Sequence, residues 1–265
     1  MKVANSLLEN CFSVIELLAE EGRSMRLSEI ADKLGLQRSG THRILSTLCG
    51  LSWVEQDERT ELYRLTLKLP AVGFRFLHAS QITDVCRPTV DRLAREIHEL
   101  VRLGVVASGR LTTIASAQGA RGSLVCQLRV FPTLPAHVTA SGKAWLATLP
   151  DDVALKVVLD SGFRNRRDFG PNAVGSVDAL LSELKKTRRQ GFGFAREEAE
   201  PGVSSIAAVV RVGDESVAAL AVVAPSFRLG EERVTAIAEK VKRAAAEIST
   251  VWPLRAITAQ ALTLD

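Results

Sequence analysis

The sequence predicts an α+β protein of two domains, a small helical unit followed by a larger domain built around a sheet. Apolar residues recur with helical spacing over residues 5–21 and 27–48, and two short alternating segments flank a polar turn at residues 57–60. Beyond residue 80, strand-like and helix-like segments come in blocks without regular alternation. We therefore expect an antiparallel sheet with flanking helices in the second domain.

Length and charge limit the interpretation. The chain has 265 residues, enough for two domains of ordinary size. Hydrophobic residues make up 46% and charged residues 24%, as in a folded globular protein. The net charge is only +4, and residues 1–80 hold ten basic and ten acidic side chains. Any affinity for nucleic acid must therefore come from local placement of charge, because no general positive field exists.

The cysteines and the hydropathy pattern exclude several classes of protein. Cys11, Cys49, Cys86 and Cys126 lie far apart without a CxxC pair, so we expect no zinc or other metal site. Because the sequence shows no secretory signal, these dispersed cysteines predict a protein of the reducing cytoplasm. No apolar run reaches the roughly 20 residues that span a membrane. We expect no membrane partner and no cofactor.

Residues 27–48 have the spacing of two short helices joined by a tight turn. Ser28 is expected to cap the first helix, and Gly35 to end it. The second helix runs from about residue 38, and polar side chains form one continuous face along it. The sequence between Leu34 and Val54 contains no acidic residue, so no carboxylate there would repel the phosphates of DNA. The helix predicts contact with double-stranded DNA through Gln37, Arg38, Ser39, Thr41, His42 and Arg43.

A β-hairpin is predicted after the second helix. Segments 53–56 and 61–65 alternate apolar and polar residues around the turn at 57–60. The combination is typical of a winged helix-turn-helix, and Arg59 near the hairpin tip would lie on a phosphate or in a minor groove. A small helical bundle with merely solvated charges is the competing interpretation. DNA affinity would depend on a few arginines, doubled in a dimer: Arg38, Arg43, Arg59 and Arg64.

A linker is predicted between the two domains. Residues 71–78 are too rich in large apolar side chains to stay exposed, so we interpret them as a helix that packs on a second copy. The expected boundaries are 1–66 for the DNA-binding domain, 67–80 for the linker and 81–265 for the second domain. Within the latter we expect helices at 81–100, 140–149, 151–159, 177–190 and 231–252, and strands at 101–107, 112–117, 124–130, 205–212 and 217–223.

Two groups of motifs carry a resemblance. The first is LSEIA at 27–31 with THRILSTL at 41–48; the second is HVTASGKA at 137–144, RQGF at 189–192, Glu197-Glu198 and Gly202. In this order they resemble the IclR family of bacterial transcription regulators along nearly the whole chain. The resemblance implies a winged helix-turn-helix, a dimerising linker helix and a GAF-like domain that binds a small effector. It also implies control of catabolic genes by homodimers or dimers of dimers on operator DNA.

The resemblance also implies where an effector binds. In relatives that bind small carboxylic acids, the ligand lies beside main-chain amides that here belong to residues 140–141, where a helix N-terminus favours negative charge. Four polar positions of those relatives have counterparts here, and three of these are apolar. We therefore expect a larger, flatter effector, an aromatic or largely apolar carboxylic acid. The predicted site is Leu134, Ala140, Ser141, Ala195, Ser205, Ala221 and Val223.

Other interpretations stay open at this point. The alanines would merely pack the core if the pocket binds nothing. A hydrolase in the second domain, with the first used for protein contact, is the alternative function. Ser141 and Lys143 have a spacing found in some active sites, but no acid partner or oxyanion hole can be assigned, so we expect no catalytic residue and no enzyme. His137 is expected to cap or pack, and Glu197-Glu198 to form a solvated turn or a salt bridge.

Overall fold

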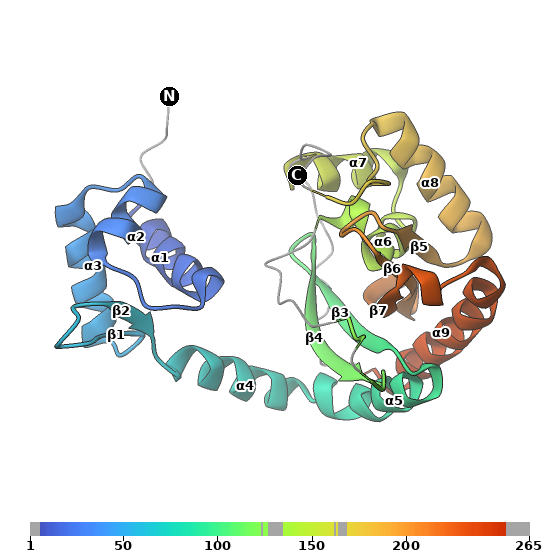
Figure 1. Ribbon diagram of the computed structural model, residues 1–265, viewed down its shortest axis with the longest axis horizontal. Coiled ribbons are helices and arrows are strands. Elements are labelled where there is room, and N and C mark those ends of the chain that lie inside the picture. The colour runs from blue at the N-terminus through green and yellow to red at the C-terminus, as the bar shows by residue number, and fades with distance from the viewer. Residues whose placement is uncertain (1–5, 123, 127–134, 162, 164–168, 253–265) are drawn as a thin grey trace. The chain divides into compact units, whose positions relative to one another are not determined.

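The structure is a computed structural model that describes residues 6–122, 124–126, 135–161, 163 and 169–252. The chain divides into two compact units, Met1–Ala79 and Ser80–Asp265 (Figure 1). Each unit has its own hydrophobic core, so each is described by itself. Among the described helices, none is both long and apolar enough to cross a membrane.

The first unit follows the predicted order of helix, helix, turn, helix and hairpin. It contains α1 (Leu7–Glu21), α2 (Leu27–Leu34), α3 (Arg38–Gly50), β1 (Val54–Gln56), β2 (Tyr63–Leu65) and α4 (Lys68–Ser80). Strands β1 and β2 pair antiparallel, with Glu55 opposite Arg64. Helices α1, α2 and α3 and the hairpin share one core, which buries Val14, Leu18, Met25, Ile30, Ile44, Leu45, Leu48, Val54 and Tyr63.

The ends of the first helices test the predicted turn chemistry. Gly35 follows α2 in the left-handed region at φ 65°, as predicted for a glycine that ends a helix there. The prediction for Ser28 is wrong, because α2 already begins at Leu27 and Ser28 lies in its first turn. The capping hydrogen bond is made by a side chain inside the helix: the Glu29 carboxylate accepts from the Arg26 backbone N–H at 2.8 Å.

Helix α4 presents two large aromatic side chains to solvent. None of its thirteen residues, all of which the structure describes, is buried. Phe74 is 71% exposed and Phe76 56% exposed. Large aromatic side chains are rarely left in water by a monomer, so this helix carries an unsatisfied apolar surface.

The second unit is an antiparallel five-stranded sheet with helices on both sides. In the sheet the strands follow the order β4-β3-β7-β6-β5, and every neighbouring pair is antiparallel, which confirms the predicted fold class. The strands are β3 (Leu100–Ala107), β4 (Arg110–Gln118), β5 (Gly193–Arg196), β6 (Val203–Val212) and β7 (Glu215–Pro225). The helices are α5 (Ile82–Ile97), α6 (Ala140–Leu146), α7 (Asp151–Asp160), α8 (Val177–Gln190) and α9 (Glu231–Val251), with short 3-10 turns at Ala136–Val138 and Ser226–Arg228.

Three predicted elements of this unit differ from the structure. The expected strand at 124–130 is absent over residues 124–126, and its remainder lies outside the described residues. Helix α6 ends at Leu146 instead of residue 149. Helix α5 ends at Ile97, where His98 adopts the left-handed conformation, and β3 starts at Leu100. Strand β5 was not predicted.

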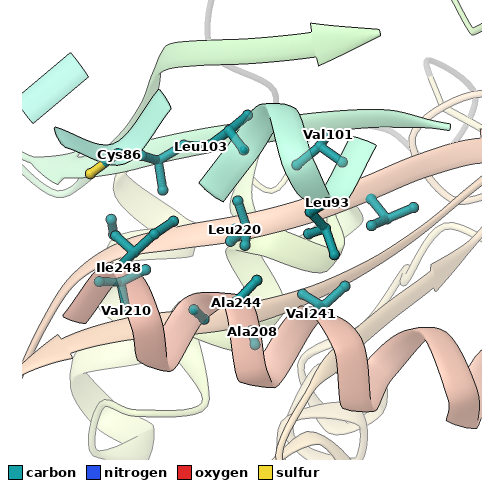
Figure 2. Packing of buried hydrophobic residues seen from close by; sticks show 14 of the residues in the cluster. Cys86, Leu93, Val101, Leu103, Ala208, Val210, Leu220, Val241, Ala244 and Ile248 are labelled. Atoms are coloured by element: carbon teal, nitrogen blue, oxygen red, sulfur yellow. The ribbon is translucent and has the colours of Figure 1, made fainter. Parts of the chain in front are cut away.

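The two faces of the sheet bury different side chains. One face, which we call the core face, packs on α5 and α9 and holds the main hydrophobic cluster. Figure 2 shows its side chains between strands and helices; those labelled are Cys86, Leu93, Val101, Leu103, Ala208, Val210, Leu220, Val241, Ala244 and Ile248. Because successive residues of a strand point to opposite faces, the residues between these belong to the other face.

We call that other face the alanine face, defined by Gly193, Ala195, Ala207 and Ala221. Helix α6 packs directly on it through Ala140 and Ala144. The approach is so close that a Cβ atom at Gly193 would lie 2.2 Å from the Ala140 carbonyl oxygen. Glycine is therefore required at residue 193, and the small side chains let the helix backbone reach the sheet.

Candidate DNA-binding and effector sites

The exposed face of α3 bears most of the residues predicted to contact DNA. Gln37, Arg38, Ser39, His42 and Arg43 are all exposed, and the buried side chains of α3 lie on its opposite face. The apolar face is held by α1, α2 and the hairpin, which fixes the direction in which the polar face points. Such a helix can enter a major groove with its N-terminal residues at base edges.

Thr41 does not belong to this face. Its side chain is fully buried, and its hydroxyl donates to the Gln37 carbonyl oxygen of its own helix at 3.1 Å. The prediction that Thr41 contacts DNA is therefore wrong. Thr41 lies three and four residues before Ile44 and Leu45, which places it on their buried face, so helical spacing could have excluded it from the set that contacts DNA.

The hairpin presents one exposed arginine at its tip. Arg59 is exposed, and its backbone N–H donates to the Asp57 carboxylate at 3.1 Å, which shapes the turn. Arg64 is different, because its Nε lies 2.6 Å from the Glu55 carboxylate across the hairpin. That carboxylate offsets the charge of Arg64, whereas Arg59 is the better candidate of the two for a phosphate contact.

The sheet register brings the predicted effector residues together. Ala195 pairs with Ser205, and Ser205 pairs with Val223, so the three form one row across β5, β6 and β7. Ala221 lies on the same face one row away, paired with Ala207. Residues from four separate stretches of sequence thus meet below the start of α6. Leu134 lies outside the described residues.

Burial divides this group in two. Ala140, Ala195 and Ala221 are at most 3% exposed and pack against one another, so they fill the space between α6 and the sheet. Ser141, Ser205 and Val223 are only half-buried. These three alanines therefore pack the core, which was the alternative left open by the sequence. The accessible part of the predicted site is made of Ser141, Ser205 and Val223.

A buried ion pair joins α6 to the segment after β5. Lys143 Nζ lies 2.6 Å from the Glu198 carboxylate and 3.4 Å from that of Glu183, with the lysine side chain 1% exposed. Burial raises the pKa of Glu198, and the charge of Lys143 opposes that rise. Glu198 is therefore half of a salt bridge, as one of the two open interpretations had it, and is not solvated. Lys143 is not available as the base of a hydrolase, because Glu198 holds its ammonium group.

The pair lines an open cleft of about 1300 Å³ between α8, β5 and the start of α9. Its lining includes Asn172, Lys186, Phe194 and Arg196. None of the described residues of the predicted effector site is among its lining residues. Sequence analysis did not single out this cleft, although Lys143, Gln190 and Glu198 of its lining belong to the motifs that carry the resemblance.

His137 packs in the interior beside Lys143. It is fully buried and stacks on Phe163 with ring centroids 4.9 Å apart, while Phe169 meets it edge-on at 5.8 Å. Burial, with a smaller contribution from the Lys143 charge, lowers its pKa to about 4. In the described part of the chain, neither ring nitrogen has a hydrogen-bond partner. The expectation that His137 packs is confirmed.

Together these features define a class of protein: a winged helix-turn-helix unit joined to an α+β domain with an antiparallel sheet, the architecture of a two-domain transcription factor. Known proteins agree. Residues 7–58 match the IclR helix-turn-helix domain, and residues 74–250 match the family described as bacterial transcriptional regulator IclR C-terminal. The chain belongs to the IclR family of bacterial transcriptional regulators, and it is a DNA-binding protein and not an enzyme.

Individual relatives cover nearly the whole chain. The HTH-type transcriptional repressor AllR of Escherichia coli K12 is 28% identical over 260 residues, which cover 94% of this chain and 91% of AllR. A putative IclR regulator from Silicibacter sp. TM1040 has a TM-score of 0.80 at 22% identity, with 94% and 96% of the two chains covered. An IclR homolog from Microbacterium hydrocarbonoxydans, solved with 4-hydroxybenzoate, has a TM-score of 0.74 at 24% identity and covers 92% and 98%.

Proposed function

We propose that this transcriptional regulator controls a catabolic operon in response to a small, aromatic or largely apolar carboxylic acid. The observation that carries the choice of effector is the row Ala195, Ser205 and Val223, which offers one hydroxyl among apolar side chains. A two- or three-carbon oxoacid would find too few hydrogen bonds there. The 4-hydroxybenzoate in the Microbacterium homolog supports an aromatic acid, and the name of AllR supports repression.

Operator binding is assigned to α3 and the hairpin. Arg38 and Arg43 would read guanine edges or clamp phosphates, with Gln37, Ser39 and His42 beside them and Arg59 on the backbone. All six side chains are exposed, which supports this assignment. Because the first unit has balanced charge, one copy should bind weakly, and two copies on two half-sites should bind well.

A second copy is proposed to cover α4. Phe74 and Phe76 are exposed on a helix that buries nothing in its own chain, and two such helices can bury each other. Residues 67–80 then act as the dimerising linker between a DNA-binding domain at 1–66 and an effector domain at 81–265. Two dimers can assemble further on the operator. Effector binding would shift the spacing of two α3 helices and hence their fit to the half-sites.

The test uses the full chain and DNA from upstream of its own gene. Fluorescence anisotropy at fixed salt measures operator binding, and calorimetry measures binding of benzoate and of pyruvate. We expect benzoate-type acids to bind and to change operator affinity, and pyruvate to bind weakly or not at all. Tight binding of pyruvate would contradict the proposed effector class.

A further inference from the structure

Arg102 lies on the alanine face of the sheet. Its neighbours Val101 and Leu103 point to the core face (Figure 2), so the residue between them points the other way. The register places Arg102 opposite Ala221 on β7 and opposite Ser116 on β4. A strong cation is therefore held beside the small side chains of the candidate effector site.

The guanidinium group of Arg102 lacks an acidic partner among the residues that the structure describes. Nη2 donates to the Thr113 hydroxyl at 3.0 Å, but the buried Nε has no acceptor. Elsewhere in this unit, half-buried Arg228 has the carboxylate of Glu99 at 3.3 Å. Burial lowers the pKa of Arg102, yet an arginine keeps its charge in proteins. A half-buried cation without a counter-ion is costly, and an anionic ligand would remove that cost.

We propose that Arg102 binds an acidic group of the effector, so that the effector carries acidic groups at two opposite ends. This inference rests on the proposed function. One carboxylate would lie near residues 140–141, where α6 begins above β5 and β6. The other would meet Arg102 on β3, with the hydroxyls of Thr113 and Ser116 beside it.

The spacing of the strands sets the size of such a ligand. From β6 to β3 there are two strand separations, and the Arg102 guanidinium reaches Thr113 on the next strand, β4, so the span is roughly 10–14 Å. A rigid aromatic ring with acidic groups at its 1 and 4 positions suits this span, with its flat body on Val223 and Ser205. A guanidinium fork can bind a carboxylate through two parallel hydrogen bonds, and the free Nε is one of its donors.

The experiment compares benzoate with benzene-1,4-dicarboxylate by calorimetry on the full chain. We expect the diacid to bind about tenfold more tightly than benzoate, since one added charge-assisted contact has that order of effect. The Arg102→Gln variant should lose this preference and bind the diacid no more tightly than benzoate, whereas Arg102→Lys should retain part of it. Arg110→Gln, which changes an exposed arginine on neighbouring β4, is the matched control and should bind both acids like the wild type.

The outcomes separate the two proposals. If benzoate binds but the diacid has no advantage, or if Arg102→Gln keeps the preference, the role of Arg102 is wrong and the proposed function stands. If the wild type binds neither acid, the proposed effector class is wrong and the role of Arg102 falls with it. Thermal unfolding checks that Arg102→Gln is folded. If it is not, Arg102→Lys decides: a diacid preference smaller than that of the wild type supports the contact, and an undiminished preference contradicts it, because lysine lacks the planar fork.

Discussion

Lys143 and Glu198 form a salt bridge that joins two segments 55 residues apart in the sequence. Their side chains are only 1% and 8% exposed, and the lysine nitrogen lies 2.6 Å from the carboxylate. A pair of this kind stabilises little by itself, because both ions lose their hydration. Its removal is costly only when one partner is left behind. This asymmetry makes the pair testable.

The Lys143→Met variant should lower the free energy of unfolding by about 3–5 kcal/mol, because Glu198 is left as an unpaired buried charge. The double variant Lys143→Met, Glu198→Leu should recover most of that loss. Urea unfolding followed by circular dichroism measures both. A double variant no more stable than the single one would show that the ion pair is not the reason for the loss.

Arg43→Ala should weaken operator binding by about tenfold at fixed salt, since it removes a contact to a phosphate or a base. Effector binding should be unchanged, because Arg43 lies in the other unit. Thr41→Ala is the informative comparison from the same helix: it should lower stability by about 1 kcal/mol with little direct effect on DNA. A gel shift with the folded variants distinguishes the two, and normal operator binding by Arg43→Ala would contradict the assignment of α3.

Replacing Phe74 and Phe76 with Glu should disrupt the dimer proposed at α4, because charges would oppose burial of that surface. Sedimentation should show a smaller species, and operator binding should fall more steeply than with any single arginine change. Exposed Phe227, far along the chain in the second unit, offers a control with Phe227→Glu. An unchanged oligomer in the double variant would place the interface elsewhere.

His137 should make stability depend on pH. Its pKa is lowered from 6.5 to about 4 in the folded chain, so between these values only the unfolded chain binds the proton. Stability is then complete above pH 6.5 and falls as the pH drops toward 4, by about 3 kcal/mol from this group. His137→Phe should flatten that part of the curve. Urea unfolding across the range tests this, and parallel curves for the two proteins would be the contrary result.

Local signals predicted the elements that have distinct ends. Helix α8 spans the predicted residues 177–190, because Ser176 caps it and Gly191 ends it in the left-handed conformation. Strand β5 has four residues and contains a glycine, which is too short for a periodic signal. Thr41 shares the helical spacing of Ile44 and Leu45, so its burial could have been predicted from the sequence. The meeting of Lys143 with Glu198 depends on tertiary contacts, and no spacing along the chain encodes it.

Successive side chains of β3 point to opposite faces of the sheet, so neighbouring residues differ in how well they tolerate substitution. Val101 and Leu103 are confined by two helices, so exchanges there would endanger folding itself. Arg102, between them, meets no such constraint from the core. A lineage that carries this sheet can therefore acquire sensitivity to a new metabolite through changes at Arg102. Saturation mutagenesis of residues 101–103 should show tolerance at the middle residue and not at its two neighbours.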